Sequence, residues 1–432
     1  MQMGAAAKSP TLHKSDVIAV VRSFALQFNP SFWKFFAAAF FFDFGFGLFF
    51  FLFNLYLTDL HFNEKSLGLI TGALTLGNVA GTVPVIILVR RFGLQKLILF
   101  CFSAAPLTCV LRTFMLWPAA QIGLAFLTGV ALCSWPICFS PMVAKLTNEK
   151  NRAAGFSVTF ATGIGLGTLA GLAGGYLPEL LLRARHAGSI VGNIRIVLLL
   201  ACGVVLLGLI PILSFRLEAA DHAGTRRIRI FHPFLFLFLP PFIIWTIVTG
   251  SFPPFAAVYL QQHLGIPLRH IGVIFSASQL VQFVAVLSAP FLYRRIGTVA
   301  GIACAQVATA VALFCMGNLH ALPLSVACYL GYTGLQWMSS PGIYSFLMDH
   351  IPEEERTIAS AIQNISGALC QAGTVAITGS CIVRLGYPAV LFGNSGIAVL
   401  AAILSVLLFG NSLSKKKHVP PLIAISHAGP EI

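Results

Sequence analysis

The chain has 432 residues, of which 57% are hydrophobic and only 9% are charged, whereas soluble domains carry about 25% charged residues. This composition excludes a soluble enzyme, a disordered protein and, despite the formal net charge of +14, a nucleic-acid-binding protein. A membrane-spanning helix needs about 20 apolar residues, so twelve spans with their loops would occupy nearly the whole chain. We therefore predict an all-α protein embedded in the lipid bilayer.

The apolar segments predict two sets of six helices. The first set covers about 33–58, 66–89, 97–116, 119–144, 156–178 and 194–215. The second set covers about 233–260, 271–293, 298–318, 321–348, 357–383 and 389–411. The expected organisation is an N-terminal segment (1–32), a first half (33–215), a connector (216–232), a second half (233–411) and a C-terminal tail (412–432).

The distribution of Lys and Arg predicts the orientation. With both termini in the cytoplasm, the 27 basic residues lie mostly on that side, as the positive-inside rule requires. The exceptions are Arg112, inside the third span, and those in the outer loops, which are Lys65, Arg183, Arg185, Arg195, Arg269 and Arg384. Residues 1–32 lack the features of a cleaved signal peptide, so we expect the first span to be retained.

An internal repeat relates the two sets of helices at a constant offset of 204 residues. Its anchors are Gly68 with Gly272, the Arg-Arg-x-Gly segments 90–93 and 294–297, Glu149 and Arg152 with Glu353 and Arg356, and Gly163 with Gly367. Repeats at a fixed period indicate a duplicated structural unit. We therefore expect two similar six-helix halves.

Two six-helix repeats with cytoplasmic termini and basic loops after helices 2 and 8 resemble the major facilitator superfamily over essentially the whole chain. The family's loop signature, Gly-x-x-x-Asp-Arg-x-Gly-Arg-Lys, is matched by Arg91, Gly93 and Lys96, with Arg90 in place of the aspartate. The family's acidic-x6-Arg pattern is present as Asp349 to Arg356.

Other family patterns are altered. The acidic-x6-Arg pattern becomes Lys145 to Arg152 in the first half, and the helix 5 run 170–175 keeps its glycines without the proline typical of drug antiporters. The resemblance leaves the subfamily open. It implies a secondary transporter that works by alternating access around a site near the bilayer midplane, lined by helices 1, 4, 7 and 10 with contributions from 2, 5, 8 and 11.

Asp43 is the only acidic residue deep within a predicted span. A carboxylate at the bilayer centre costs about 2.5–3.5 kcal/mol on insertion scales, so it is expected to take up a proton or to face a cavity or a cation. We interpret Asp43 as a proton-coupling site or as the counter-ion of a cationic substrate. The alternative is a protonated acid that hydrogen-bonds a neighbouring helix.

Polar and tryptophan side chains at helical spacing predict a central cavity. The candidate substrate-binding residues are Asn54, Asn78, Trp135, Trp245, Gln279, Gln282, Gln336, Trp337, Tyr344, Gln363 and Gln371. Unpaired amides are costly in hydrocarbon, so these side chains should point inward, and indoles suit sugars or aromatic cations. The alternatives are that the amides pair between helices and that the tryptophans are ordinary core residues.

Charged residues in the cytoplasmic loops predict an inner gate. Its candidate members are Arg90, Arg91, Glu149, Arg152, Arg294, Arg295, Asp349, Glu353 and Arg356. We expect Arg90 or Arg91 to pair with the acids at 353–355, and Arg294 or Arg295 to pair with Glu149, when the cavity opens outward. The alternative is that these charges are solvated and serve topology alone.

The resulting function prediction is a secondary active transporter of a small organic solute, proton-coupled through Asp43. The alternatives are an uncoupled facilitator of a neutral polar solute such as a sugar, a receptor-like relative that does not transport, and a membrane-embedded enzyme. The ten cysteines lie in apolar runs without CxxC pairs, and the histidines lack ligand spacing, so we expect no metal, cofactor or catalytic residue. We expect a monomer in the plasma membrane, and the short connector suggests a bacterial inner membrane.

Overall fold

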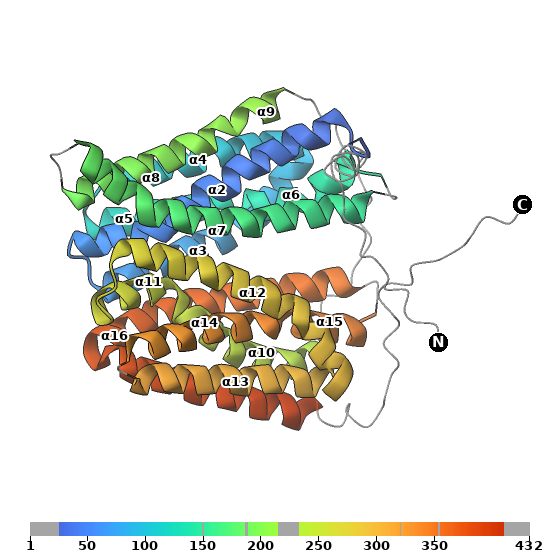
Figure 1. Cartoon of the computed structure of the whole chain (residues 1–432). Coiled ribbons are helices and arrows are strands. Elements are labelled where there is room, and N and C mark those ends of the chain that lie inside the picture. The colour runs from blue at the N-terminus through green and yellow to red at the C-terminus, as the bar shows by residue number, and fades with distance from the viewer. Residues whose placement is uncertain are drawn as a thin grey trace, which may run out of the picture.

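The computed structural model describes residues 26–148, 151–185, 189–214, 233–319, 321–352 and 355–409. Within these residues the chain is a bundle of helices, arranged as two groups that lie side by side (Figure 1). We call α2 to α9 the first group and α10 to α16 the second group. The resemblance to the major facilitator superfamily predicted an all-helical fold of this kind.

The first group contains eight helices. They are α2 (Pro30–Asp59), α3 (Glu64–Phe92), α4 (Leu94–Phe114), α5 (Pro118–Leu132), α6 (Ser134–Leu146), α7 (Arg152–Arg185), α8 (Ile190–Leu207) and α9 (Leu209–Leu213). Breaks at Cys133 and Gly208 divide two of the predicted spans into α5 with α6 and α8 with α9.

The second group follows the connector. Its elements are α10 (Pro233–Ser251), the 3-10 turn η1 (Pro253–Phe255), α11 (Ala256–Val258), the π-helical turn η2 (Tyr259–His263), α12 (Leu268–Ile296), α13 (Thr298–Asn318), α14 (Leu322–Met338), α15 (Ser340–His350) and α16 (Arg356–Phe409). α16 contains one non-helical residue, Gly386, so it consists of two helices in sequence.

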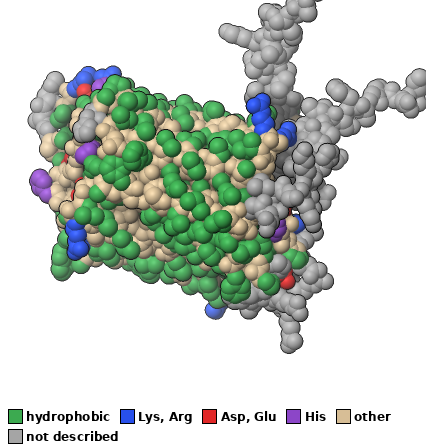
Figure 2. Space-filling model, turned by 90° about the horizontal axis from the view of Figure 1, so that it is seen from below, with side chains coloured by type: hydrophobic (Ala, Val, Ile, Leu, Met, Phe, Trp, Pro, Cys, Tyr) green, Lys and Arg blue, Asp and Glu red, His purple; other side chains and the backbone are tan. Residues whose placement is uncertain are grey.

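Ten helices of the described residues are long and apolar enough to cross a membrane. Because α16 holds two helices and α14 continues into α15, this arrangement is compatible with the twelve predicted spans. Figure 2 shows that apolar side chains cover the middle of the visible face, while Lys, Arg and His gather toward its two ends. A lipid-facing surface has this distribution.

Local sequence signals explain several helix boundaries. The side chain of Asn29 accepts a hydrogen bond from the backbone N–H of Phe32 at 2.7 Å and so caps α2. Gly93 and Gly297, which are equivalent in the repeat, end α3 and α12 with φ of 84° and 88°. With ψ near 160° this backbone region is available essentially to glycine alone, which explains the glycine in both copies of the loop motif.

The two groups approach most closely near one end of the bundle. We call this end, where α2 ends and α3 begins, the Asp59 end, and the opposite end the Pro30 end. A Cβ built on Gly171 of α7 would lie 2.6 Å from Ser276 Oγ of α12, and one on Gly68 of α3 would lie 2.6 Å from a backbone oxygen of α16. From there α7 and α12 diverge toward the Pro30 end (Figure 1).

Candidate functional site

A cavity of about 300 Å³ lies at mid-length of the second group. It is bounded by α10, α14, α15 and α16, and its lining residues are Phe242, Trp245, Thr246, Thr249, Gln336, Trp337, Ser340, Ile343, Tyr344, Gln363, Asn364, Gly367, Ala368 and Gln371. Six of the predicted substrate-binding residues lie in this lining, namely Trp245, Gln336, Trp337, Tyr344, Gln363 and Gln371. We call it the amide cavity.

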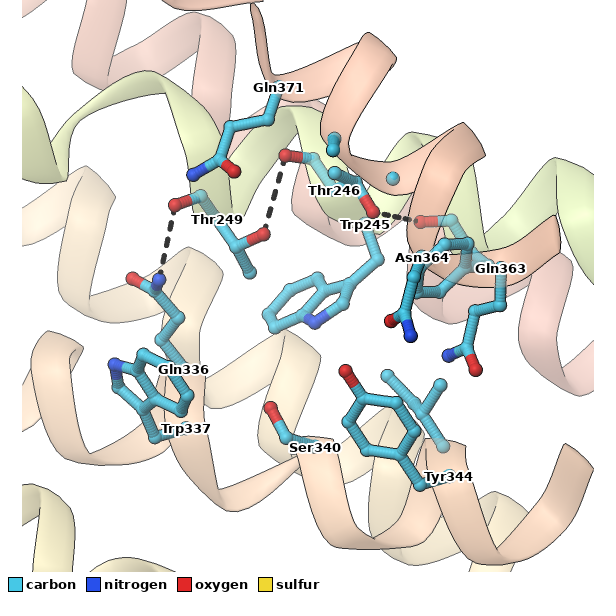
Figure 3. Close-up of a pocket in the computed structure, with 14 residues that line it drawn as sticks. Trp245, Thr246, Thr249, Gln336, Trp337, Ser340, Tyr344, Gln363, Asn364 and Gln371 are labelled. Carbon is cyan, nitrogen blue, oxygen red and sulfur yellow. Dashed lines mark hydrogen bonds between the residues drawn. The ribbon is translucent and has the colours of Figure 1, made fainter. Parts of the chain in front are cut away.

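The amides differ in how well they are satisfied by the protein. Gln336 donates a hydrogen bond to the backbone oxygen of Thr249 at 3.3 Å, which fixes its orientation (Figure 3). Gln363 is 0% exposed, and neither its Nε2 nor its Oε1 has a hydrogen-bond partner. A buried amide without partners costs about 1–3 kcal/mol. The lining of the cavity therefore contains an amide nitrogen and an amide oxygen whose hydrogen bonds a bound molecule could satisfy.

Aromatic side chains give the cavity flat apolar walls. Trp245 is 3% exposed and forms an interior wall, whereas Trp337 and Tyr344 are about half exposed. In Figure 3 the indole of Trp245 and the phenol of Tyr344 face the same space as the amides of Gln363 and Asn364. Flat apolar faces beside amide donors and acceptors suit a small solute with both ring surfaces and polar groups.

The remaining candidate residues lie elsewhere. Trp135 stacks on Phe42 with ring centroids 4.3 Å apart and also contacts Phe35, so it packs in the aromatic core of the first group. Asn54 donates to the backbone oxygen of Pro254 at 2.8 Å and lines a separate cavity near the Asp59 end. Gln279 lies against Gly167 of α7. Neither Asn78 nor Gln282 is in the lining of these two cavities.

Asp43 lies between α2 and α7. A Cβ built on Gly163 would be 3.1 Å from Asp43 Oδ2, so the glycine makes room for the carboxyl group. Among the described residues, no hydrogen bond or ion pair reaches the Asp43 side chain, and Asp43 does not line the amide cavity. Gly163 corresponds to Gly367 in the repeat, and Gly367 does line the amide cavity.

Among the described residues, the side-chain hydrogen bonds that join the first group to the second group lie in the middle of the bundle and at the Asp59 end. Besides Asn54 with Pro254, Gln261 donates to Asp59 Oδ1 at 3.1 Å, and Tyr387 donates to Glu64 Oε1 at 3.3 Å. Ser276 Oγ donates to the backbone oxygen of Thr168 at 2.7 Å. The structure is therefore closed at the Asp59 end.

The predicted gate residues that the structure describes lie at the Pro30 end. Glu149 and Glu353 lie outside the described residues, as do the side chains of Arg90 and Arg152. Arg91, Arg294, Arg295 and Asp349 are exposed. Arg356 donates to the backbone oxygens of Met348 and Ile351. Within the described part of the chain the one salt bridge is Arg183–Glu179, so the gate pairs stay a prediction for the opposite conformation.

Sequence reasoning missed part of the cavity. Thr246 and Thr249 on α10, Phe242 one turn earlier and Asn364 on α16 line it but were not among the candidates. Asn364 follows Gln363 directly, and Thr246 follows Trp245. Their positions next to predicted candidates were the sequence feature that could have identified them. Phe242 carries no such signal, because apolar residues surround it in the sequence.

Comparisons with known proteins agree with this architecture. The family model described as Major Facilitator Superfamily matches residues 35–375 and 247–428. A search of curated proteins found no match.

Several solved structures are similar to this chain. The nucleoside transporter NupG superposes with a TM-score of 0.71 at 13% identity, covering 88% of this chain and 99% of that one. A D-xylose-proton symporter gives 0.69 at 13% identity, covering 87% and 96%. A bacterial homologue of the human lysosomal transporter Spinster, in an inward-facing and unoccupied conformation, gives 0.70 at 13% identity, covering 91% and 100%. At these identities the similarity shows a shared fold.

Proposed function

The chain belongs to the Major Facilitator Superfamily, and from this membership we propose that it is a secondary active transporter of a small polar organic solute that binds in the amide cavity. As an integral membrane protein of this family it is a transporter rather than an enzyme. We further propose that the amide cavity is the binding site, that the solute is small, polar and organic, that transport proceeds by alternating access, and that it is coupled to protons.

One observation carries the choice of site. Gln363 is fully buried, yet both polar atoms of its amide lack protein partners. Natural proteins retain few such groups, and a solute that hydrogen-bonds the amide would remove the penalty. The location at mid-length of the spans supports a transport site, because transporters place substrate near the bilayer midplane.

The solute class follows from the lining. The described residues that line the amide cavity include amides, hydroxyls and two indoles, and none of them is Lys, Arg, Asp or Glu. A neutral molecule with several hydrogen-bonding groups and a flat face fits this surface better than an ion would. A nucleoside transporter and a D-xylose-proton symporter are among the proteins with a similar fold, so nucleosides and pentoses are the first solutes to test.

Uptake into proteoliposomes tests the site. We expect saturable uptake of at least one nucleoside or pentose, reduced about tenfold or more by Gln363→Leu, since a lost polar contact to a buried group costs about 1–3 kcal/mol. Gln95→Leu is the matched control, because Gln95 lies in α4 of the first group, where its amide contacts Ile212. Equal uptake by wild type and Gln363→Leu would exclude the amide cavity as the site.

We place proton coupling at Asp43. Its carboxyl group lies in a span without a cationic partner among the described residues, and a carboxyl group in such a place favours the protonated form. Asp43→Asn should abolish uptake driven by a pH gradient and leave solute exchange at equilibrium largely intact. Uptake that still follows the pH gradient in this variant would remove Asp43 from the coupling step.

A second candidate is an uncoupled facilitator, which one observation favours. Asp43 does not line the amide cavity, so its carboxyl group does not act on a bound solute by direct contact. Wild-type uptake that is insensitive to a pH gradient would support the facilitator.

Family membership supports the placement of both termini in the cytoplasm. We also propose that the protein is a monomer in a bacterial inner membrane, which the short connector suggests, with protons as the coupling ion. Protease protection of tags fused to the two termini, in vesicles of known orientation, tests the topology.

A further inference from the structure

Arg112 is a buried cation inside the membrane-spanning bundle. It lies near the end of α4 and is 2% exposed. Its guanidinium carbon stands 4.2 Å above the centroid of the Phe53 ring of α2. Charged residues inside spans are rare, and those that occur usually pair with an opposite charge or mark a functional site.

The protein satisfies this cation only in part. Arg112 Nε donates to Gln121 Oε1 at 3.4 Å, and Nη1 has no hydrogen-bond partner. No carboxylate pairs with Arg112 in the part of the chain that the structure describes. The amide nitrogen of Gln121 donates to the backbone oxygens of Arg112 and Met115, so Gln121 is fixed in a position where its oxygen faces the guanidinium.

Arg195 lies in the same region and has a closer hydrogen-bond partner than Arg112. It is only partly buried, and its Nε donates to the hydroxyl oxygen of Tyr56 at 2.8 Å. Arg112 is more deeply buried and less well bonded than Arg195. A buried charge that lacks an opposite charge is strongly destabilising, so a missing anionic partner is the simplest explanation for Arg112.

Arg112 lines a second cavity of about 240 Å³ near the Asp59 end. Its other polar side chains are those of Asn54, Thr71 and Tyr329. The rest of the lining is apolar and includes Phe50, Phe53, Ala257, Leu260 and Phe275. We call this the outer cavity.

We propose that the outer cavity binds an organic monoanion with an apolar body, whose carboxylate pairs with Arg112. A guanidinium matches a carboxylate in geometry and charge, and Nη1 is the donor left open. The aromatic and aliphatic lining favours a hydrocarbon body over a fully hydrated inorganic ion. One cationic side chain in the lining matches a single negative charge.

This site is separate from the amide cavity, and the inference goes beyond the proposed function. The outer cavity lies between the two groups, with residues of α2, α3, α4, α11 and α12 in its lining, whereas the described residues that line the amide cavity all belong to the second group. Binding to one site can therefore be tested while the other is disabled.

Equilibrium binding of radiolabelled benzoate to the full-length protein in nanodiscs tests the proposal, with unlabelled benzamide as the neutral competitor of the same shape. We expect saturable benzoate binding that benzamide does not displace. Arg112→Gln should weaken it at least about tenfold, as expected for loss of a hydrogen bond to a charged group, and Arg112→Lys should restore part of it.

Three further variants separate the explanations. Ala257→Phe, which keeps Arg112 but fills the outer cavity, should also abolish binding, so the result does not depend on Arg112→Gln alone. Arg195→Gln should bind benzoate like wild type, because Arg195 already has a protein partner. Gln363→Leu should also bind it normally, even if it has lost solute uptake.

The proposal is overturned if wild type shows no saturable benzoate binding, if benzamide competes equally, or if Arg112→Gln binds as wild type does. It is also overturned if Arg195→Gln loses binding to the same extent as Arg112→Gln, since this would reflect the overall positive charge of the region.

Discussion

The phenol of Tyr387 donates a hydrogen bond to Glu64 Oε1 at 3.3 Å and thereby joins residues 323 positions apart in the chain. Glu64 begins α3 in the first group, and Tyr387 follows the non-helical Gly386 in the second group. The ring of Tyr387 also lies 5.2 Å from that of Tyr259. This contact holds the two groups together at the Asp59 end.

Removing this hydrogen bond should loosen the Asp59 end. In a background without native cysteines, we expect Tyr387→Phe to speed maleimide labelling of Leu260→Cys about threefold to tenfold, since the net contribution of a hydrogen bond to a charged group is about 1.5–3 kcal/mol and this one is partly exposed. Leu260 is 1% exposed and lines the outer cavity, so its labelling reports opening.

Tyr293→Phe is the control for this measurement. Tyr293 donates to the backbone oxygen of Met338 at 2.6 Å, which is a contact within the second group. Labelling that is unchanged in Tyr387→Phe, or equally faster in Tyr293→Phe, would show that the Glu64 contact does not hold this end closed.

The glycines of α7 predict a position-dependent effect of alanine. Gly→Ala in a helix ordinarily stabilises by about 0.5–1 kcal/mol. At Gly171 the added methyl would meet Ser276 Oγ at 2.6 Å and Phe275 Cδ1 at 2.8 Å, whereas at Gly165 nothing lies within 4 Å. We expect Gly171→Ala to lower the melting temperature and Gly165→Ala to raise it or leave it unchanged. A similar shift in both variants would contradict close packing of α7 on α12.

Substitution by leucine should affect the stability of the protein differently at two fully buried glutamines, Gln121 and Gln363. Gln121 makes three hydrogen bonds, so Gln121→Leu should destabilise the protein by about 1–3 kcal/mol by leaving partners unsatisfied. Gln363 makes none, so Gln363→Leu should leave the melting temperature in detergent unchanged or raise it. A large destabilisation by Gln363→Leu would mean that its amide has a structural role.

Charge reversal tests the predicted inner gate. If Arg90 pairs with Glu353 when the Pro30 end closes, then Arg90→Glu and Glu353→Arg should each reduce transport, and the double variant should recover it. An exposed pair contributes only about 0–1 kcal/mol, so the recovery should appear in transport rate and not in melting temperature. A double variant no better than the worse single variant would leave topology as the role of these charges.

The repeat and the apolar segments predicted most of the architecture because both signals are local. Gly93 and Gly297 have the same backbone conformation at equivalent positions, which the offset of the repeat anticipated. Breaks within spans, such as those at Cys133 and Ser339, were not predicted. These breaks lie inside continuous apolar segments, so the hydrophobicity of the sequence does not reveal them.

The candidate site was predictable where one helix carries several amides. Gln363 and Gln371 of α16 lie in one cavity, as their helical spacing suggested. Trp135 and Trp337 occupy nearly equivalent repeat positions, yet Trp135 packs among phenylalanines and Trp337 lines the cavity. The sequence marks Arg112 only as a basic residue inside a predicted span. In both cases the neighbours on other helices decide the role, and a single sequence does not show them.

All the described residues that line the amide cavity belong to α10, α14, α15 and α16, and this location in the second group has a kinetic consequence. A solute bound there would move with the second group, and movement of the first group would open or close access to it. Substitutions in α2 to α9 should then change how fast the solute is exchanged between the two sides of the membrane, while its equilibrium affinity stays a property of the second group.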